Sequence, residues 1–233
     1  MVNGQGVCID LGQCPQGANE IGQWLWNRPL DSPPRASLIL AHGAGAPMDS
    51  AFMASMAERL AARGIAVVRF EFPYMAARRQ GAGRRPPDPQ VRLLDCWRET
   101  YGLLRERISG PLAIGGKSMG GRMASLLADE LEADALVCLG YPFHPAGKMD
   151  RPRTAHLAEI ATPTLIVQGE RDAMGNRATV MGYPLSAAIR LHWLAAADHD
   201  LKPLKASGIT HERYLDAAAD AVAGFLQLPG RDC

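Results

Sequence analysis

The sequence is poor in the features that mark membrane, secreted and nucleic-acid-binding proteins. Its cysteines number five and are scattered, which argues against a disulfide framework and favours a reducing, cytoplasmic compartment. No apolar run approaches membrane-spanning length, and the first residues do not have the basic-then-apolar pattern of a signal peptide. The formal net charge is only +1, which gives no general reason to expect nucleic acid as a partner.

Spaced metal ligands and interdomain linkers are also missing. No CxxC motif and no His/Cys pair has zinc-ligand spacing, so we expect no metal. With 233 residues, of which 47% are hydrophobic, the chain can bury a sizeable core. We therefore expect one domain over residues 1–233. Residues 1–34 would form a peripheral N-terminal segment, with a strand or hairpin in its short apolar pieces.

Short apolar runs alternate with segments of helical periodicity through most of the chain. The runs are of buried-strand length and cover residues 36–41, 65–70, 112–115, 135–140, 164–168 and 189–194. Helices are expected from Asp49 or Ser50 to Gly64, from Asp88 and Pro89 to about residue 108, after residue 118, within residues 176–188 and from about His211. This alternation predicts an α/β fold with a mostly parallel sheet covered by helices on both faces.

The most informative stretch is residues 112–127, LAIGGKSMGGRMASLL. Gly116 to Gly120 fit G-x-S-x-G, in which a sharp strand-to-helix turn presents a serine at its tip. The glycines would then be needed because neighbouring chain segments pass too close for a Cβ. The end of a phosphate-binding P-loop is an alternative, but it requires glycine where the chain has Pro111.

Serine catalysis needs a base and an acid, and three residues follow predicted strands in the order Ser, acid, His. These are Ser118, Asp172 and His199. Reactive groups collect at the carboxyl ends of parallel strands, so we expect the three side chains to meet. The other histidines lie within a strand, at a helix start, before the acid, or in the first glycine turn. Glu170, Asp198 and Asp200 are the competing acids.

An oxyanion hole needs two backbone N–H groups directed at the developing charge. We expect one from Met119, at the start of the helix after the serine, and one from Ala44, in the glycine turn after residues 36–41. The sequence leaves the place of Lys117 open between the lining of a pocket and a surface salt bridge.

Two long connections lack clear periodicity. Residues 71–90 predict an irregular loop that carries Arg78, Arg79, Arg84 and Arg85. These arginines either are solvated or lie near the active site and favour an anionic substrate. Residues 141–161 predict a long loop or a small cap. They leave no room for a large lid, so we expect an open site.

Several blocks give the chain a family resemblance: HGAGAPMDS, RFEFPYM, GGKSMGGRMAS, LGYPFHPAGK and ADHDLKP. It resembles the α/β-hydrolase superfamily and its dienelactone-hydrolase-like branch. It is most similar to the predicted-hydrolase family that includes testis-expressed protein 30 and NSL-complex subunit 3. The resemblance implies an α/β-hydrolase fold with a minimal cap or none and carries the catalytic roles onto Ser118, Asp172 and His199. It also implies that Tyr141 and His144 shape the pocket.

The sequence therefore predicts a serine hydrolase that acts without a cofactor on a small ester, thioester or activated amide. Its partners would be a small-molecule substrate, which the loop arginines suggest is anionic, and at most a second copy of the chain, as a monomer or homodimer. A scaffold or interaction protein built on the same fold is the alternative, since one family member belongs to a chromatin complex. A perhydrolase would use the same three residues.

Overall fold

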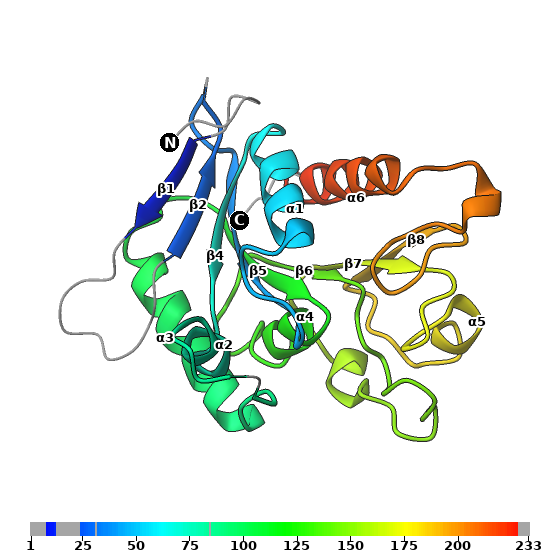
Figure 1. Cartoon of the computed structure of the whole chain (residues 1–233). Coiled ribbons are helices and arrows are strands. Elements are labelled where there is room, and N and C mark those ends of the chain that lie inside the picture. Colours follow the sequence, from blue (N-terminus) through cyan, green and yellow to red (C-terminus); the bar gives the residue numbers. More distant parts are fainter. Residues whose placement is uncertain (1–7, 13–23, 31, 84, 228–233) are drawn as a thin grey trace.

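Eight strands form one sheet in the computed structural model, which describes residues 8–12, 24–30, 32–83 and 85–227 (Figure 1). Their order across the sheet is β1-β2-β4-β3-β5-β6-β7-β8. Strands β3 to β8 are parallel, whereas β1 and β2 run antiparallel to their neighbours. The strands are β1 (Cys8–Gly12), β2 (Trp24–Arg28), β3 (Ala36–Ala41), β4 (Ile65–Phe70), β5 (Leu112–Lys117), β6 (Ala135–Leu139), β7 (Thr164–Gly169) and β8 (Ile189–Leu194).

Helices cover both faces of this sheet. Helices α1 and α6 pack together on one face, and α3 and α4 pack on the other (Figure 1). The helices are α1 (Ala51–Ala61), α2 (Pro73–Arg79), α3 (Gln90–Arg105), α4 (Met119–Ser125), α5 (Arg177–Val180) and α6 (His211–Leu226). The predicted α/β architecture is therefore confirmed.

The strand residues divide between two hydrophobic cores because successive side chains of a strand point to opposite faces. In β3, Leu38 and Leu40 pack with the residues of α1 and α6, whereas Ile39 and Ala41 pack with those of α3 and α4. All six residues of β3 are buried. A strand buried on both faces reads as a continuous apolar run, which is why the sequence marks it so clearly.

Several predicted elements need correction. Residues 71–90 are not wholly irregular, because α2 lies within them. Pro89, not Asp88, precedes α3, and the Asp88 carboxylate instead accepts a hydrogen bond from the backbone N–H of Tyr74. The helix expected within residues 176–188 is only the four-residue α5. The N-terminal pieces form β1 and β2, although the adjoining residues 1–7 and 13–23 lie outside the described part.

The connection from β6 to β7 carries no helical domain above the sheet. Residues 140–163 hold one short 3-10 turn, Ala155–Ala158, so the small-cap prediction reduces to a loop. Within the described residues, this connection therefore places no lid over the carboxyl ends of the strands.

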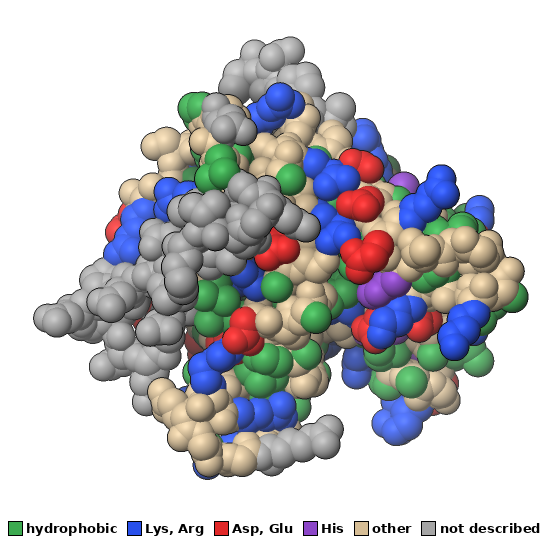
Figure 2. Space-filling view, turned by 45° about the horizontal axis from the view of Figure 1, so that its top comes forward, with side chains coloured by type: hydrophobic (Ala, Val, Ile, Leu, Met, Phe, Trp, Pro, Cys, Tyr) green, Lys and Arg blue, Asp and Glu red, His purple; other side chains and the backbone are tan. Residues whose placement is uncertain are grey.

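Charged side chains are interleaved on the face that carries α1 and α6 (Figure 2). Arg59 of α1 is 3.0 Å from Asp216 of α6, and Arg63 is 2.6 Å from Asp220. These ion pairs accompany the apolar contact between the two helices. In the described residues, no helix is long and apolar enough to cross a membrane.

Candidate active site

Ser118 lies at the turn between β5 and α4 with an unusual backbone conformation. Its φ is 51° and its ψ is −116°, a region that residues with a side chain rarely adopt. The Ser118 N–H donates to Leu139 O of β6 at 3.0 Å, and Ser118 O accepts from Arg122 N at 3.0 Å. The strand-turn-helix context expected for G-x-S-x-G is therefore present, and the P-loop alternative fails because residues 112–117 are strand.

The glycines around Ser118 are explained by close backbone packing. A Cβ on Gly116 would lie 2.6 Å from Gly120 C and 2.7 Å from Ala41 O. A Cβ on Gly120 would lie 2.6 Å from both Ala41 O and His42 O. Backbone atoms cannot move aside as a flexible side chain can, so the tight turn requires glycine at both positions.

A continuous line of hydrogen bonds joins Ser118, His199 and Asp172. Ser118 Oγ is 2.8 Å from His199 Nε2, and His199 Nδ1 is 2.7 Å from Asp172 Oδ2. A carboxylate can only accept, so Nδ1 carries the proton and Nε2 is free to accept from the serine hydroxyl. Asp172 is fully buried, whereas the His199 side chain is 22% exposed. The three side chains that the sequence selected are thus brought together.

Gln168, at the end of β7, holds the Asp172 carboxylate in place. Its Nε2 donates to Asp172 Oδ2 at 2.8 Å and to Gly175 O at 3.1 Å, while its Oε1 accepts from Tyr141 N at 2.7 Å. Asp172 Oδ1 accepts from Met174 N at 2.8 Å. The sequence analysis missed Gln168. The available signal was an amide side chain in an otherwise apolar buried strand, four residues before the acid.

The competing acids have other partners. Asp198 Oδ1 accepts from the backbone N–H groups of Asp200 and Lys202, both at 2.9 Å, and so closes the turn that carries His199. Glu170 pairs with Arg177 at 2.7 Å. Asp200 pairs with Lys117 at 3.3 Å, and the carboxylate that is hydrogen-bonded to the His199 ring is that of Asp172.

The Ala44 N–H is fixed in direction by contacts to its own peptide group. His42 Nδ1 donates to Gly43 O at 2.7 Å, because its Nε2 accepts from Phe72 N at 3.1 Å. Tyr74 Oη lies 3.4 Å from the same Gly43 O, and it donates to Ala44 O, the carbonyl of the next peptide group, at 3.0 Å. Since a peptide N–H points opposite to the carbonyl of the same unit, the bond at Gly43 O turns the Ala44 N–H away from His42. Among the described residues, no group accepts from the N–H of Ala44 or Met119.

His42 is therefore a neutral structural histidine. It is fully buried, and burial lowers its pKa below the usual 6.5. Its ring packs edge-on against Phe72, with ring centroids 5.1 Å apart. The prediction that His42 shapes the first glycine turn is confirmed.

One arginine of the predicted basic loop forms ion pairs with carboxylates of the protein itself. Arg79 donates to Asp49 at 2.9 Å and to the buried carboxylate of Glu71, which is 2.6 Å away. Glu71 Oε1 also accepts from Met48 N at 3.3 Å, so this network anchors the segment that follows Ala44. Arg78 lies over the Tyr74 ring, with its guanidinium carbon 5.2 Å from the ring centroid.

The four loop arginines thus differ in whether protein groups already bind them. Arg79 is paired with protein carboxylates, and Arg84 lies outside the described residues. Arg85 is exposed, and its carbonyl accepts a hydrogen bond from Arg78. The anionic-substrate hypothesis stays a prediction.

Tyr141 and His144, expected to shape the pocket, are both buried. The Tyr141 hydroxyl donates to Arg153 O at 3.0 Å, so it supports the loop after β6. His144 Nδ1 donates to Pro145 O at 2.9 Å, and its Nε2 is buried without a hydrogen-bond partner in the described structure. Direct contact of either residue with substrate stays a prediction.

A second Ser–His contact, between Ser125 and His156, has a different character. Ser125 Oγ donates to Arg122 O at 2.8 Å, so it accepts from His156 Nε2, also at 2.8 Å. Within the described residues no carboxylate is hydrogen-bonded to His156. Burial is the main cause that lowers its pKa to about 4. A hydroxyl whose proton is held by a carbonyl cannot pass it to the histidine, so this contact is structural.

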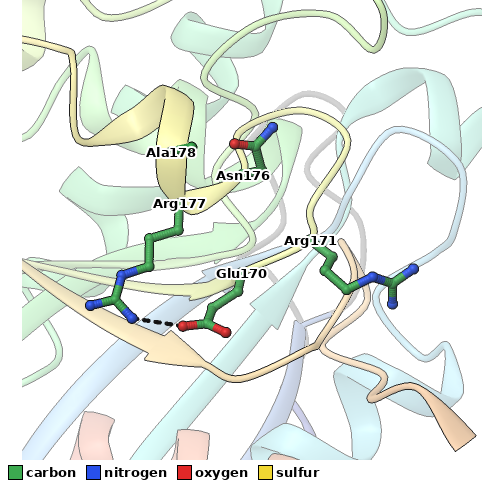
Figure 3. Close-up of a pocket in the computed structure, with 5 residues that line it drawn as sticks. All are labelled: Glu170, Arg171, Asn176, Arg177 and Ala178. Atoms are coloured by element: carbon green, nitrogen blue, oxygen red, sulfur yellow. Dashed lines mark hydrogen bonds and ion pairs between the residues drawn. The ribbon is translucent and has the colours of Figure 1, made fainter. Parts of the chain in front are cut away.

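A shallow hollow of about 690 Å³ lies beside the acid loop, lined by Glu170, Arg171, Asn176, Arg177 and Ala178 (Figure 3). Glu170 and Arg177 face each other within it. Glu170 Oε2 accepts from Ala196 N at 3.3 Å, and Arg171 Nη1 donates to Ala196 O at 3.2 Å. The lining residues thus join the loop of Asp172 to the loop of His199. Ser118 and His199 are not among them.

The family assignment follows from residues 34–227, which match the alpha/beta hydrolase domain family. The chain belongs to this family. The match extends from the residues just before β3 to the end of α6 and so includes the serine turn, the acid loop and the histidine loop.

Solved structures resemble this α/β hydrolase over nearly its whole length. Dienelactone hydrolase from Anabaena variabilis is 19% identical, with 97% of this chain and 99% of that one covered and a TM-score of 0.71. An α/β serine hydrolase without a lid from Xanthomonas campestris is 19% identical, with coverage of 95% and 97% and a TM-score of 0.64. Est1E from Butyrivibrio proteoclasticus is 13% identical, with coverage of 94% and 99% and a TM-score of 0.65. At these identities the likeness is one of fold.

Proposed function

We propose that this chain is a serine hydrolase of the carboxylesterase or thioesterase type, acting on a small ester, thioester or activated amide. The observation that carries the proposal is the unbroken hydrogen-bonded line from Ser118 Oγ through His199 to the buried Asp172 carboxylate. Nucleophile, base and orienting acid are the three parts that covalent acyl transfer requires. The strained serine turn and the directed Ala44 N–H agree with the same chemistry.

The proposed reaction has two halves. Ser118 Oγ attacks the substrate carbonyl carbon while His199 Nε2 takes the hydroxyl proton, and the Ala44 and Met119 N–H groups stabilise the oxyanion. When the carbon–leaving-group bond breaks, His199 gives its proton to the leaving group and an acyl-enzyme remains. Water then attacks the acyl carbon, its proton passes to His199, and the Ser118 oxygen recovers a proton as the acid is released. Asp172 stays ionised and orients the imidazole throughout.

The open edge of the sheet bears on the kind of substrate. No helical cap covers the described chain between β6 and β7, so a small or partly exposed substrate fits better than one enclosed in a long tunnel. We further propose that the chain falls in the group of predicted hydrolases that includes testis-expressed protein 30 and NSL-complex subunit 3. Three blocks support this: GGKSMGGRMAS forms the serine turn, LGYPFHPAGK follows β6, and ADHDLKP forms the histidine loop.

A fluorophosphonate probe tests the proposed function directly, since it reacts only with an activated serine. We expect the wild type to be labelled, and Ser118→Ala and His199→Ala to lose labelling while remaining folded. Ser125→Ala is the matched control and should label like the wild type, because its hydroxyl bonds a carbonyl. A folded wild type that resists labelling would contradict the proposal and favour a scaffold role.

A further inference from the structure

Lys117 immediately precedes Ser118, and its ammonium group is buried beneath the histidine loop. Lys117 is only 7% exposed, yet it is the one charged residue of β5. Its Nζ donates to His199 O at 2.8 Å and lies 3.3 Å from Asp200 Oδ1. Of the two places that the sequence left open, the structure shows the salt bridge, with a buried lysine and an exposed carboxylate. Lys117 connects the serine turn to the main chain of the histidine.

Other elements fix the position of this ammonium group. The Phe52 ring of α1 lies under it, with Nζ 5.5 Å from the ring centroid. A Cβ on Gly140, after β6, would lie 2.6 Å from His199 O and 3.2 Å from Lys117 Nζ. The lysine thus occupies a narrow space between α1, the end of β6 and the His199 loop.

The charge at this place needs a counter-ion. The imidazole of His199 becomes positive during the proposed reaction, and a bare ammonium group next to it would oppose that step. Burial lowers the pKa of Lys117, whereas the neighbouring Asp200 carboxylate raises it. Asp200 is thus placed to offset the lysine charge while the lysine holds the loop.

Two residues of the histidine loop have strained backbones, so this loop needs contacts that hold its conformation. Ala196 has a φ of 53° and Leu201 a φ of 60°, both unusual for residues with a side chain. Asp198 closes the turn locally, and His211 Nε2 is 3.0 Å from Asp200 O on the outer side. Arg171 N and Tyr214 Oη hold the loop at Ala197 O and Ala195 O, whereas Lys117 Nζ holds it at His199 O, from the end of β5 next to Ser118.

We propose that Lys117 and Asp200 form a positioning pair that fixes the His199 main chain and so keeps its ring between Asp172 and Ser118. The inference rests on the proposed function. Neither residue reaches the reacting atoms in this arrangement. Their contribution is to hold the base at hydrogen-bonding distance from the nucleophile, where a displacement of about 1 Å can cost about a hundredfold in rate.

The test compares Lys117→Met, Lys117→Arg, Asp200→Asn and the double variant K117M/D200N with wild type, using p-nitrophenyl acetate and the fluorophosphonate probe. We expect K117M to lower kcat about 10- to 100-fold with KM changed less than about threefold. K117R should recover part of the loss. D200N should lower kcat, and the double variant should be no worse than K117M because the two residues act as a unit.

Lys202→Met is the matched control, since Lys202 lies on the same loop with an exposed side chain, and its charge acts on Asp200 less strongly than that of Lys117. It should keep kcat within about twofold of wild type, in line with other surface substitutions. A folded K117M with wild-type kcat would overturn the proposal. The proposal would also be overturned if K117M were less stable but its folded fraction kept the wild-type kcat. Lys117 would then have a purely structural role.

A readout independent of turnover separates this inference from the proposed function. The proton on His199 Nδ1, shared with Asp172, gives a low-field NMR signal, and we expect it to broaden or shift in K117M but not in K202M. If the wild type shows no labelling, the proposed function fails, and this signal still decides the positioning pair. An unchanged signal in K117M would overturn the pair even where the wild type is active.

Discussion

A single buried residue, Gln168, orients the carboxylate of Asp172 although it does not touch the reacting atoms. Gln168 is fully buried and uses both atoms of its amide group, on the backbone of Tyr141 and on the Asp172 carboxylate. Each of these bonds lies in a dry environment, where an unpaired group is costly. Gln168 therefore fixes the direction of a carboxylate that has no access to solvent.

Replacing Gln168 by leucine should harm both stability and catalysis. We expect the free energy of unfolding to fall by about 1–3 kcal/mol, because the Tyr141 N–H loses its buried acceptor. Turnover of p-nitrophenyl acetate should fall about tenfold as Asp172 loses a donor. Urea unfolding and steady-state kinetics measure the two effects. Gln80→Leu, at the exposed end of α2, is the control and should leave both unchanged.

Tyr74 offers a similar test for the proposed oxyanion loop. Its hydroxyl donates to Ala44 O and also lies 3.4 Å from Gly43 O, the carbonyl of the peptide group that carries the Ala44 N–H, so Tyr74→Phe removes a support of this turn. We expect kcat to fall about fivefold, the equivalent of about 1 kcal/mol, with little change in KM. Tyr183→Phe removes a hydroxyl without a partner in the described structure and should keep wild-type kcat. Equal kcat for both variants would contradict this role of Tyr74.

At the scale of elements, the junction of β5 and α4 is the most tightly constrained part of the fold. Gly120 lies in the first turn of α4, against the carbonyl groups that end β3. Gly102 also lies in a helix, α3, but a Cβ there would meet nothing within 4 Å. Close packing therefore requires glycine at position 120, whereas position 102 has room for a larger residue.

Alanine substitution should separate these two cases. Gly120→Ala should lower the free energy of unfolding by about 2–3 kcal/mol, because the added Cβ meets backbone that can move only with the strand. Gly102→Ala should raise it by about 0.5–1 kcal/mol, the usual gain in an exposed helix. Thermal or urea unfolding gives both values, and a neutral Gly120→Ala would show that the turn can relax.

The elements were predictable where local pattern and tertiary structure agree. The bounds of β3 and β4 coincide with the predicted apolar runs, since a strand buried on both faces of a parallel sheet is apolar throughout. The bounds of β8, a partly exposed edge strand, also match the predicted ones. Helix α2 was missed because long-range contacts stabilise it, among them the pairing of Arg79 with Asp49. Helix α5 lies within the predicted range 176–188 but fills only four residues of it, since weak periodicity does not set a boundary.

The same contrast holds for the candidate site. Ser118, Asp172 and His199 could be selected because each follows a strand, and parallel strands end at one edge. The roles of Tyr74 and Lys117 could not be predicted, because their partners lie 30 and 82 positions away in the chain and no spacing rule connects them. The supporting residues of a site are therefore harder to read from sequence than its reacting groups.

At the scale of the whole molecule, buried neutral histidines couple folding to pH. The pKa of His156 falls from its usual 6.5 to about 4, mainly through burial, and that of His42 is also lowered. Between pH 6.5 and 4 the unfolded chain binds protons that the folded protein does not. Stability should therefore decrease as the pH falls through this window and be independent of these groups above it.

His156→Gln tests this coupling without touching the proposed triad. We expect the wild type to lose about 1 kcal/mol more stability than the variant between pH 7 and pH 5, a value reduced for the partial exposure of the ring. Urea unfolding at the two pH values gives the comparison. A variant with the same pH dependence as the wild type would show that His156 does not contribute.

The left-handed backbone of Ser118 implies a trade-off between activity and thermostability. Glycine adopts such a conformation without strain, so Ser118→Gly should unfold at a higher temperature than Ser118→Ala, by about 1 kcal/mol in free energy. Calorimetry of the two inactive variants would measure the difference. A library of this chain screened for heat resistance alone would then drift toward glycine at position 118 and lose its nucleophile. Engineering the protein would need selection for turnover alongside selection for stability.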